Sequence, residues 1–189
     1  MSAFTEGLLA HRALFERLQA LQPEVEGAAM LMAESLRRGG KLMLMGNGGS
    51  AADCQHLAAE FTGRFRSERQ PLAAIALTTD SSALTCIGND YGFEQVFSRQ
   101  LAALARPGDC VVGISTSGRS ANVLRALAQA RALGLASIGL TGRDGGDMLA
   151  LCDLNIVVPH RDTARIQEAH IFIGHSWCEM VETMLISDG

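Results

Sequence analysis

The sequence has little charge and lacks any cysteine pattern typical of a metal site. Charged side chains make up 19% of its 189 residues and apolar ones 48%. Low surface charge favours a homo-oligomer that buries part of its surface. The cysteines are widely spaced, with no C-x-x-C pair, which excludes the common structural zinc motifs and favours a reduced, cytoplasmic setting. They are Cys54, Cys86, Cys110, Cys152 and Cys178.

The sequence also lacks an excess of basic residues, a basic N-terminal leader and a long apolar run. Sixteen basic against twenty acidic side chains give a formal net charge of −4, so neither nucleic acid nor an anionic membrane is the expected partner. No stretch approaches the roughly 18 consecutive apolar residues of a membrane span. The first twenty residues lack a basic segment followed by an apolar core. We therefore expect a soluble, cytoplasmic protein that begins at Met1.

Five short apolar runs alternate with helix-length segments, each bounded by turn residues. This pattern is typical of a parallel sheet with helices on both faces, and it predicts an α/β fold in the form of a three-layer αβα sandwich. The runs are KLMLM (41–45), AAIAL (73–77), CVVGI (110–114), ASIGL (136–140) and LNIVV (154–158).

Two helices are expected before the first strand and one long helix after the last. Residues 1–38 carry an apolar helical stripe and then a second helix with Pro23 near its start. These helices are well placed to pack against another subunit. Residues 163–186 read as one helix, and no linker or repeat divides the chain. We expect a single domain over 1–189, with its α/β core in 39–189.

The stretch GISTSGRSANV predicts a phosphate site. It follows a strand and enters a helix, and in open α/β sheets ligands bind beyond the carboxyl ends of the strands. Hydroxyls and free amides at a helix N-terminus favour an anion. The alternative is simple helix capping, which needs only one such residue, whereas four hydroxyls are present. No lysine completes a P-loop, so a phosphomonoester is favoured. The four are Ser115, Thr116, Ser117 and Ser120.

The stretch GNGGSAA, after the first strand, loosely fits a dinucleotide-binding pattern through Gly46, Gly48 and Ala51. That pattern requires an acid about 20 residues further on to hold the ribose. Asp80 is the first acid after the second strand and lies well beyond that point. A nicotinamide cofactor is therefore not favoured.

Two polar pairs on predicted helices could carry chemistry. His56 and Glu60 are four residues apart and share a helix face; Gln167 and His175 lie on the final helix. Taken singly, the first pair reads as a surface ion pair and His175 as a core histidine. Eight residues of helix separate Gln167 from His175 by about 12 Å. Either Gln167 lies on an irregular first turn, or neighbouring subunits complete the site. No role is expected for His11, His160 and His170.

Five blocks together resemble the phosphoheptose isomerases, a family with the sugar isomerase (SIS) fold, which is flavodoxin-like. The resemblance runs from Gly39 onward. It implies an aldose/ketose isomerase that converts D-sedoheptulose 7-phosphate to D-glycero-D-manno-heptose 7-phosphate, the first step towards the heptose of lipopolysaccharide or related glycans. It also implies a cytoplasmic homotetramer with active sites between subunits and one zinc ion per subunit. The blocks are GNGGSAADCQHLAAEFTGRF, ALTTDSSALTCIGNDYGFEQVFSRQ, GISTSGRSANV, LTGRDGGDM and ARIQEAHIFIGH.

The same resemblance implies a role for each matching residue. Glu60 and His175 form the acid/base pair. Arg119 departs from the family's usual uncharged residue or lysine, and either adds charge near the phosphate or faces solvent. The phosphate ligands are Ser115, Thr116, Ser117 and Ser120; the sugar is lined by Asn47, Gly48, Gly49, Asn89 and Asp90, with Glu60 and Gln167 also touching substrate; the zinc ligands are His56, Glu60, Gln167 and His175.

The chemistry of isomerisation suits these residue types. A base must remove a proton from C1, a second group must move the oxygen-bound proton, and the enediolate between them needs stabilisation. A carboxylate and an imidazole suit the first two tasks, and a metal would supply the third. Bare backbone at Gly48 and Gly49 would let the sugar lie close. A carboxylate on zinc is a weaker base than a free one, so either the metal binds loosely and shifts, or it acts mainly on structure and orientation.

Two other functions remain in competition. A non-catalytic SIS protein would bind a phosphosugar or a replication initiator, but such relatives lack the glutamate and the last histidine, and this chain has both Glu60 and His175. An isomerase for another phosphosugar, such as a pentose 5-phosphate, commonly carries extra domains that a chain of 189 residues does not hold.

Overall fold

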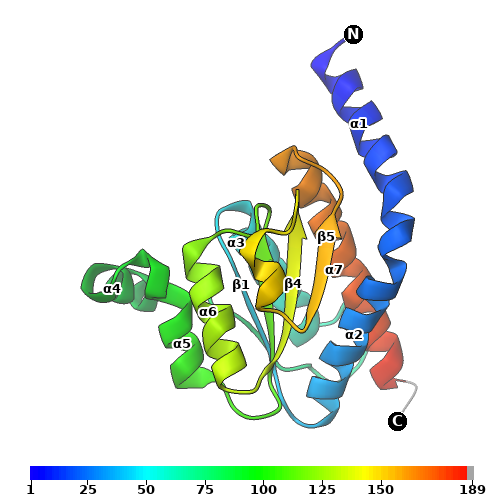
Figure 1. The fold of residues 1–189 in the computed structure, drawn as a ribbon. Coiled ribbons are helices and arrows are strands. Elements are labelled where there is room, and N and C mark those ends of the chain that lie inside the picture. The colour runs from blue at the N-terminus through cyan, green and yellow to red at the C-terminus, as the bar shows by residue number, and fades with distance from the viewer. Residues whose placement is uncertain (187–189) are drawn as a thin grey trace.

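The five apolar runs form one parallel sheet in the computed structural model, which describes residues 1–186 (Figure 1). The strand order is β2-β1-β3-β4-β5, the flavodoxin-like order of doubly wound sheets. Every neighbouring pair is parallel, which confirms the prediction. The strands are β1 Leu42–Gly46, β2 Ala74–Ala76, β3 Cys110–Ser115, β4 Ala136–Gly142 and β5 Leu154–Val158.

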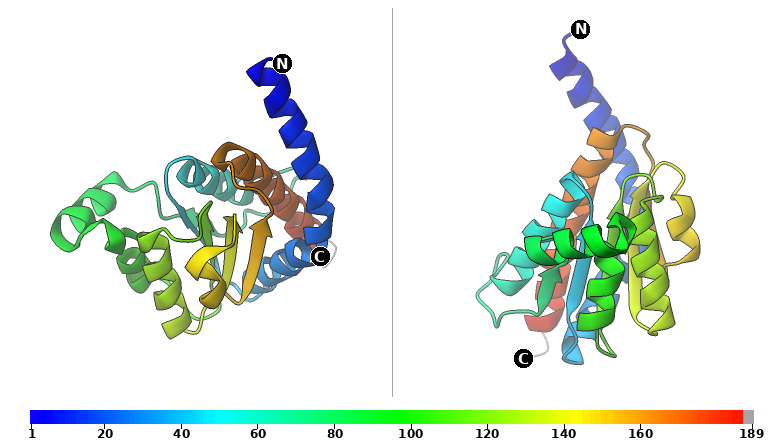
Figure 2. Two further views of the ribbon diagram at one scale, coloured as in Figure 1. Left: turned by 45° about the horizontal axis from the view of Figure 1, so that its top comes forward. Right: turned by 90° about the vertical axis from the view of Figure 1, so that its left-hand side faces the viewer.

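Helices cover both faces of the sheet, which completes the predicted αβα sandwich (Figures 1 and 2). One face packs against α2, α3 and α7, and the other against α5 and α6. The helices are α1 Ala3–Leu18, α2 Gln22–Arg37, α3 Gly49–Thr62, α4 Ser81–Tyr91, α5 Val96–Leu104, α6 Ala121–Ala132 and α7 Thr163–Ile186, with short 3-10 turns η1 Gln19–Leu21, η2 Phe93–Gln95 and η3 Gly146–Ala150.

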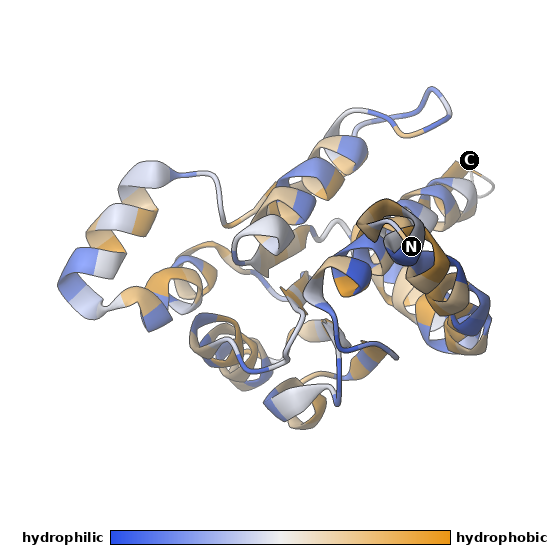
Figure 3. Ribbon diagram, turned by 90° about the horizontal axis from the view of Figure 1, so that it is seen from above, coloured by the Kyte–Doolittle hydropathy of each residue, from blue (hydrophilic) through white to orange (hydrophobic). Residues whose placement is uncertain are grey.

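Alternate residues of the central strands enter two separate cores. Leu42 and Leu44 of β1 join the core under α2, α3 and α7. Met43 and Met45 join the core under α5 and α6. This is why the strands read as continuous apolar runs rather than alternating ones. Viewed from above, the covering helices carry hydrophobic and hydrophilic segments in turn along their ribbons (Figure 3), as expected where only one stripe faces a core.

Two helices project from this sandwich on opposite sides (Figure 2, left). Helix α1 buries only Leu14 and Leu18, and Phe4 near its start is 79% exposed. Helix α4 has no buried residue at all. An apolar helix face stabilises a fold only where it is covered, so both helices present surface that this chain leaves open.

The last helix, α7, follows the predicted range 163–186. It is 24 residues long, with its first turns at the carboxyl edge of the sheet and its Trp177 in the core, donating to the Val25 carbonyl at 3.2 Å. Within residues 1–186, neither α7 nor any other helix combines the length and apolarity needed to cross a membrane.

A crevice is expected at the carboxyl ends of β1 and β3. These strands are neighbours in the sheet, although β2 lies between them in the sequence. The chain therefore leaves β1 toward one face, into α3, and leaves β3 toward the other, into α6. Such a switch point is where doubly wound folds bind ligands. The two loops that follow these strands are the glycine loop and the serine-rich loop of the sequence analysis.

Candidate active site

A cavity of about 290 Å³ opens at this switch point. Three helices begin at its wall: α3 at Gly49, α6 just after Ser120 and α7 at Thr163. Unpaired N–H groups and the positive ends of helix dipoles favour an anion at such a place. The cavity has no basic side chain among its lining residues, which are Asn47, Gly48, Gly49, Ser50, Ile114, Ser115, Thr116, Ser120, Thr163 and Gln167.

The hydroxyls of the serine-rich loop face one another instead of capping α6. Ser115 Oγ lies 2.9 Å from Ser120 Oγ and 3.5 Å from Ser117 Oγ. Ser120 occupies the N-cap position of α6, yet its side chain makes no capping hydrogen bond. The capping alternative is therefore wrong for Ser120. A cluster of hydroxyls that bond chiefly to each other can turn toward an incoming anion.

A second glycine-rich loop supports the serine-rich loop from behind. Gly118 packs so closely on the carbonyl of Gly145 that a Cβ there would collide with it. The Met148 amide donates to the Gly118 carbonyl at 3.2 Å. A Cβ on Gly146 would in turn come within 2.6 Å of the carbonyls of Ser117 and Gly118, so this close approach requires a glycine on each loop.

Arg119 points toward Asp144 rather than the cavity. Its guanidinium donates to both carboxylate oxygens of Asp144, each at 2.8 Å. The hydrogen bond to Asp144 raises the pKa of Arg119, and the same bond holds the pKa of the Asp144 carboxyl well below its ordinary value. Of the two alternatives left open for Arg119, added charge at the phosphate is not supported.

The glycine loop is fastened to α6 by a pair of amides. Asn47 Nδ2 donates to Asn122 Oδ1 at 2.9 Å, and Asn122 Nδ2 returns a bond to Asn47 Oδ1 at 2.7 Å. Asn122 is buried. The pair joins the loops after β1 and β3, so it fixes the width of the crevice between them.

Gly48 and Gly49 are glycines for different reasons. Gly48 has φ +56 and ψ −122, a backbone conformation that only glycine adopts easily, although a Cβ there would meet nothing. Gly49 has no such need, but a Cβ on it would come within 2.5 Å of Gln167 Nε2. The explanation that bare backbone at Gly49 admits the sugar is therefore incomplete, because it also makes room for Gln167.

His56, Glu60 and His175 gather where α3 passes α7. His56 Nε2 lies 2.9 Å from His175 Nε2, so one ring donates to the other, and 3.5 Å from Glu60 Oε1. The His56 side chain is 49% exposed and that of Glu60 24%. Phe65 stacks on the His175 ring, with centroids 5.6 Å apart. We call these three polar residues the His/Glu cluster.

The His/Glu cluster lies some way along the helices from the phosphate cavity. Glu60 is eleven residues beyond Gly49 on α3, about 16 Å at 1.5 Å per residue. Gln167 stays at the cavity, beside Gly49, and α7 is already regular there, since it begins at Thr163. The alternative of an irregular first turn is therefore wrong. Within one chain Gln167 does not join the His/Glu cluster.

Asn89 and Asp90 lie in a third place, on the projecting helix α4. Asn89 Nδ2 donates to Asp90 Oδ1 at 2.7 Å, and both residues are exposed. Helix α4 packs mainly on α5 and η2, and neither residue lines the cavity. The predicted site residues thus fall into three groups within a single chain.

The residues predicted to bind zinc have donor types that suit this ion, namely two imidazoles and a carboxylate. However, no three His, Cys, Asp or Glu side chains in residues 1–186 are arranged as a metal site, and Gln167 is distant. The donor chemistry fits the ion, while the fourth ligand would have to come from elsewhere.

The three histidines with no predicted role have other contacts. His11 Nδ1 lies 2.8 Å from Glu168 Oε2, and His160 Nδ1 accepts from the Asp162 amide at 3.0 Å. His170 is 1% exposed, with Nε2 bonded to the Thr141 carbonyl at 3.0 Å. Burial lowers the pKa of His170 from 6.5 to about 4, so this side chain is a neutral part of the core.

Comparison with known proteins agrees with this geometry. The SIS domain family matches residues 9–142. The phosphoheptose isomerase of Aliarcobacter butzleri (strain RM4018) is 54% identical over 185 residues, which cover 97% of this chain and 98% of that protein. The chain belongs to the phosphoheptose isomerase family. The resemblance seen in the motifs is confirmed, and the non-catalytic alternative is not favoured.

Solved structures of phosphoheptose isomerases share the fold. One from Neisseria gonorrhoeae is 50% identical, with a TM-score of 0.85 and 95% of both chains covered. One from Francisella tularensis is 35% identical, with a TM-score of 0.89, covering 97% of this chain and all of that one. The α/β class and SIS fold are therefore confirmed for this member of the family.

The sequence motifs give no role to two residues near the site, Asn122 and Asp53. Asn122 follows the serine-rich loop by two positions, and only its tertiary partner, Asn47, reveals its role. Asp53 has a carboxylate oxygen that is buried without a partner, and burial raises its pKa while nearby His56 lowers it. Its spacing of three from His56 on a helix was the one signal that could have drawn attention to it.

Proposed function

We propose that the protein is the isomerase that interconverts D-sedoheptulose 7-phosphate and D-glycero-D-manno-heptose 7-phosphate, with Glu60 and His175 as its acid/base pair. The observation that carries this assignment is the cavity at three helix N-termini, whose hydroxyls and backbone N–H groups support phosphate binding without any basic side chain. The relatives named phosphoheptose isomerase support the substrate. The product would enter heptose synthesis for lipopolysaccharide or a related glycan.

Each group of residues would perform one part of the reaction. The hydroxyls of Ser115, Thr116, Ser117 and Ser120 and the helix N-termini hold the phosphate, which fixes the far end of the sugar. Glu60 removes the C1 proton and returns it to C2. His175 moves a proton between the oxygens on C1 and C2. The carbonyl thereby passes from C2 to C1 with no net change in protons.

A zinc ion is part of the proposal. His56, Glu60 and His175 would hold it, with Gln167 as a fourth ligand supplied by a neighbouring subunit. When bound, it would stabilise the negative charge that develops on the substrate oxygens. The convergence of the His56 and His175 nitrogens supports this assignment. Because a carboxylate that holds zinc is a weaker base than a free one, the ion would be held loosely or would act mainly on the structure and orientation of the site.

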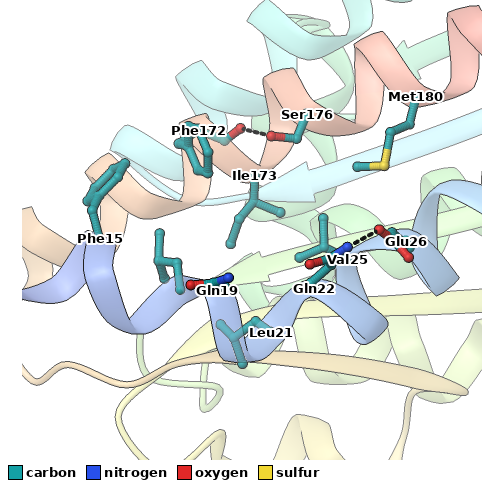
Figure 4. A pocket seen from close by; sticks show the side chains of 11 residues that line it. Phe15, Gln19, Leu21, Gln22, Val25, Glu26, Phe172, Ile173, Ser176 and Met180 are labelled. Atoms are coloured by element: carbon teal, nitrogen blue, oxygen red, sulfur yellow. Dashed lines mark hydrogen bonds between the residues drawn. The ribbon is translucent and has the colours of Figure 1, made fainter.

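We further propose a homotetramer whose active sites lie between subunits. The separation of the cavity, the His/Glu cluster and α4 supports it, because one chain does not unite them. An apolar cavity of about 350 Å³ between α1–α2 and α7 also supports the homotetramer, because a neighbouring subunit would cover it. Figure 4 shows Phe15 and Phe172 at one end of it, Met180 at the other, and Ile173 and Val25 between.

The state of the cysteines bears on the cellular compartment of the protein. The five cysteines are all free thiols, and three of them are buried. Unpaired thiols persist in reducing compartments. We therefore propose a cytoplasmic enzyme, where phosphorylated sugars are available as substrates.

The direct test of activity is to incubate the purified protein with sedoheptulose 7-phosphate and follow the aldose by NMR. We expect conversion, and loss of most activity after chelation with recovery on adding zinc. An active apoprotein would remove zinc from the proposal and leave the isomerase. No aldose under either condition would overturn the function.

Subunit mixing tests the shared site. Glu60→Gln subunits and Ser120→Ala subunits, each impaired alone, are dissociated and reassociated together. If a site draws on two chains, some mixed sites contain neither substitution, and activity measured at a substrate concentration well below KM should exceed that of both parents. Activity that never rises above the better parent would place each whole site within one chain.

A further inference from the structure

The carboxylate of Glu182 is buried with every one of its strong hydrogen-bonding positions in use. Oε1 accepts from the amides of Arg66 at 3.1 Å and Ser67 at 2.7 Å. Oε2 accepts from the amide of Phe65 at 3.1 Å and from Arg69 Nε at 3.0 Å. Burial alone would raise the pKa of Glu182, but these bonds together hold it below its ordinary value. The group is therefore an anion that binds a turn of backbone.

Arg69 contacts both Glu182 and the last turn of α3. Its side chain is 5% exposed and that of Glu182 4%. Arg69 Nη2 donates to the carbonyl of Glu60 at 2.8 Å, and Nη1 donates to that of Phe61 at 2.9 Å. Carbonyls in the last turn of a helix have no partner within it. Arg69 supplies that partner at the residue proposed as the base.

The anchored turn also reaches the other member of the acid/base pair. Phe65, whose amide is bound by Glu182, stacks on the His175 ring. Glu182 itself lies seven residues beyond His175 on α7, two turns along the same side of the helix. A single buried ion pair thus fixes the backbone of Glu60 and the ring packed on His175.

We propose that Glu182 and Arg69 are positioning residues for the isomerisation. They hold the turn at residues 63–69 so that Phe65 sets the orientation of His175 and α3 presents Glu60 to it. The contacts of this ion pair reach both proposed catalytic residues, through the ring of Phe65 on His175 and through the carbonyl of Glu60. Displacing reacting groups by about 1 Å costs on the order of 100-fold in rate. The inference rests on the proposed function.

The test compares two glutamates of α7. Glu182→Gln removes the buried anion, and Glu179→Gln is the matched control, since Glu179 pairs with Arg66 of the same turn at 2.8 Å but on the surface. We expect Glu182→Gln to lower kcat at least about 10-fold with KM within about twofold. Glu179→Gln should alter neither. A folded Glu182→Gln protein with wild-type kcat would overturn the proposal.

A second variant decides the matter should Glu182→Gln fail to fold. Phe65→Leu keeps an apolar side chain but removes the ring on His175, and we expect the same fall in kcat with KM retained; wild-type kcat would overturn the proposal. Hydrogen exchange at the amides of Phe65, Arg66 and Ser67 tests the anchoring without any substrate. Faster exchange in Glu182→Gln, with unchanged exchange in Glu179→Gln, is expected even if the substrate were a different phosphosugar.

Discussion

The phosphate cavity and the His/Glu cluster consist of different kinds of chemical group. The cavity is made of backbone N–H groups, hydroxyls and helix ends, all neutral and held by contacts within one chain. The His/Glu cluster is made of ionisable side chains on the outer sides of two helices, half-exposed and with one predicted ligand missing. The difference teaches that one chain builds the cavity completely, whereas under the proposed function the His/Glu cluster depends on a ligand from a neighbouring subunit.

The largest expected effect separates binding from chemistry. Glu60→Gln keeps the shape of the side chain but cannot accept the C1 proton, so we expect kcat to fall about 10³-fold, within the usual contribution of a general base. Affinity for inorganic phosphate, measured by calorimetry, should stay within about twofold because the cavity is untouched. A variant that isomerises at more than a tenth of the wild-type rate would remove Glu60 from the base role.

The buried histidine of α7, His170, extends the comparison to pH. Because the pKa of His170 is lowered from 6.5 to about 4, the unfolded chain binds more protons than the folded one between these values. The free energy of unfolding should therefore fall as pH drops from 6.5 to 4, by up to about 3 kcal/mol from this residue. Urea titrations at several pH values should give a flatter profile for His170→Gln than for the wild type. Parallel profiles would contradict this origin.

A smaller effect is expected in the cavity. Ser120→Ala removes one hydroxyl that would bond the phosphate in substrate and transition state alike, so KM should rise about 10-fold with kcat nearly unchanged. Steady-state kinetics with sedoheptulose 7-phosphate measure both. A large fall in kcat at constant KM would mean that the loop takes part in the chemical step.

The smallest effect is expected at the nearest arginine. Arg119 is bound to Asp144 at the surface, and exposed ion pairs contribute little. Arg119→Gln should change KM by less than about twofold. Comparison with Ser120→Ala, one residue away, makes this a sharp control. An increase in KM as large as that of Ser120→Ala would show that the cavity does use a basic side chain.

The elements that depend on local pattern could be predicted from the sequence. Each apolar run became a strand because the sheet is covered on both faces, and the serine-rich loop was recognised because its residues are adjacent in the chain. Gln167 was more difficult, since its place beside Gly49 depends on how α7 crosses α3. The Asn47–Asn122 pair joins residues 75 positions apart, and no pattern within either segment indicates it.

The buried ion pair between Glu182 and Arg69 could not be predicted from the sequence either. In the sequence Glu182 is one acid in an amphipathic helix, indistinguishable from Glu179 three residues earlier. Only the packing of the turn at residues 63–69 against α7 buries one of them and leaves the other exposed. Likewise, the family's motif predicts that Asn89 and Asp90 line the sugar, but α4 projects from the sandwich (Figure 2) and neither residue lines the cavity, which follows from tertiary packing alone.

The central claim is that the phosphate cavity and the Glu60/His175 pair act on one sugar. It is tested most directly by exposing the wild-type protein to sedoheptulose 7-phosphate and, separately, to unphosphorylated sedoheptulose in deuterated water, and following isomerisation and deuterium at C1 and C2 by NMR. The account predicts conversion with deuterium uptake for the phosphate ester, at a rate orders of magnitude above that for the free sugar. Equal rates for the two sugars, or no reaction of the ester, would contradict it.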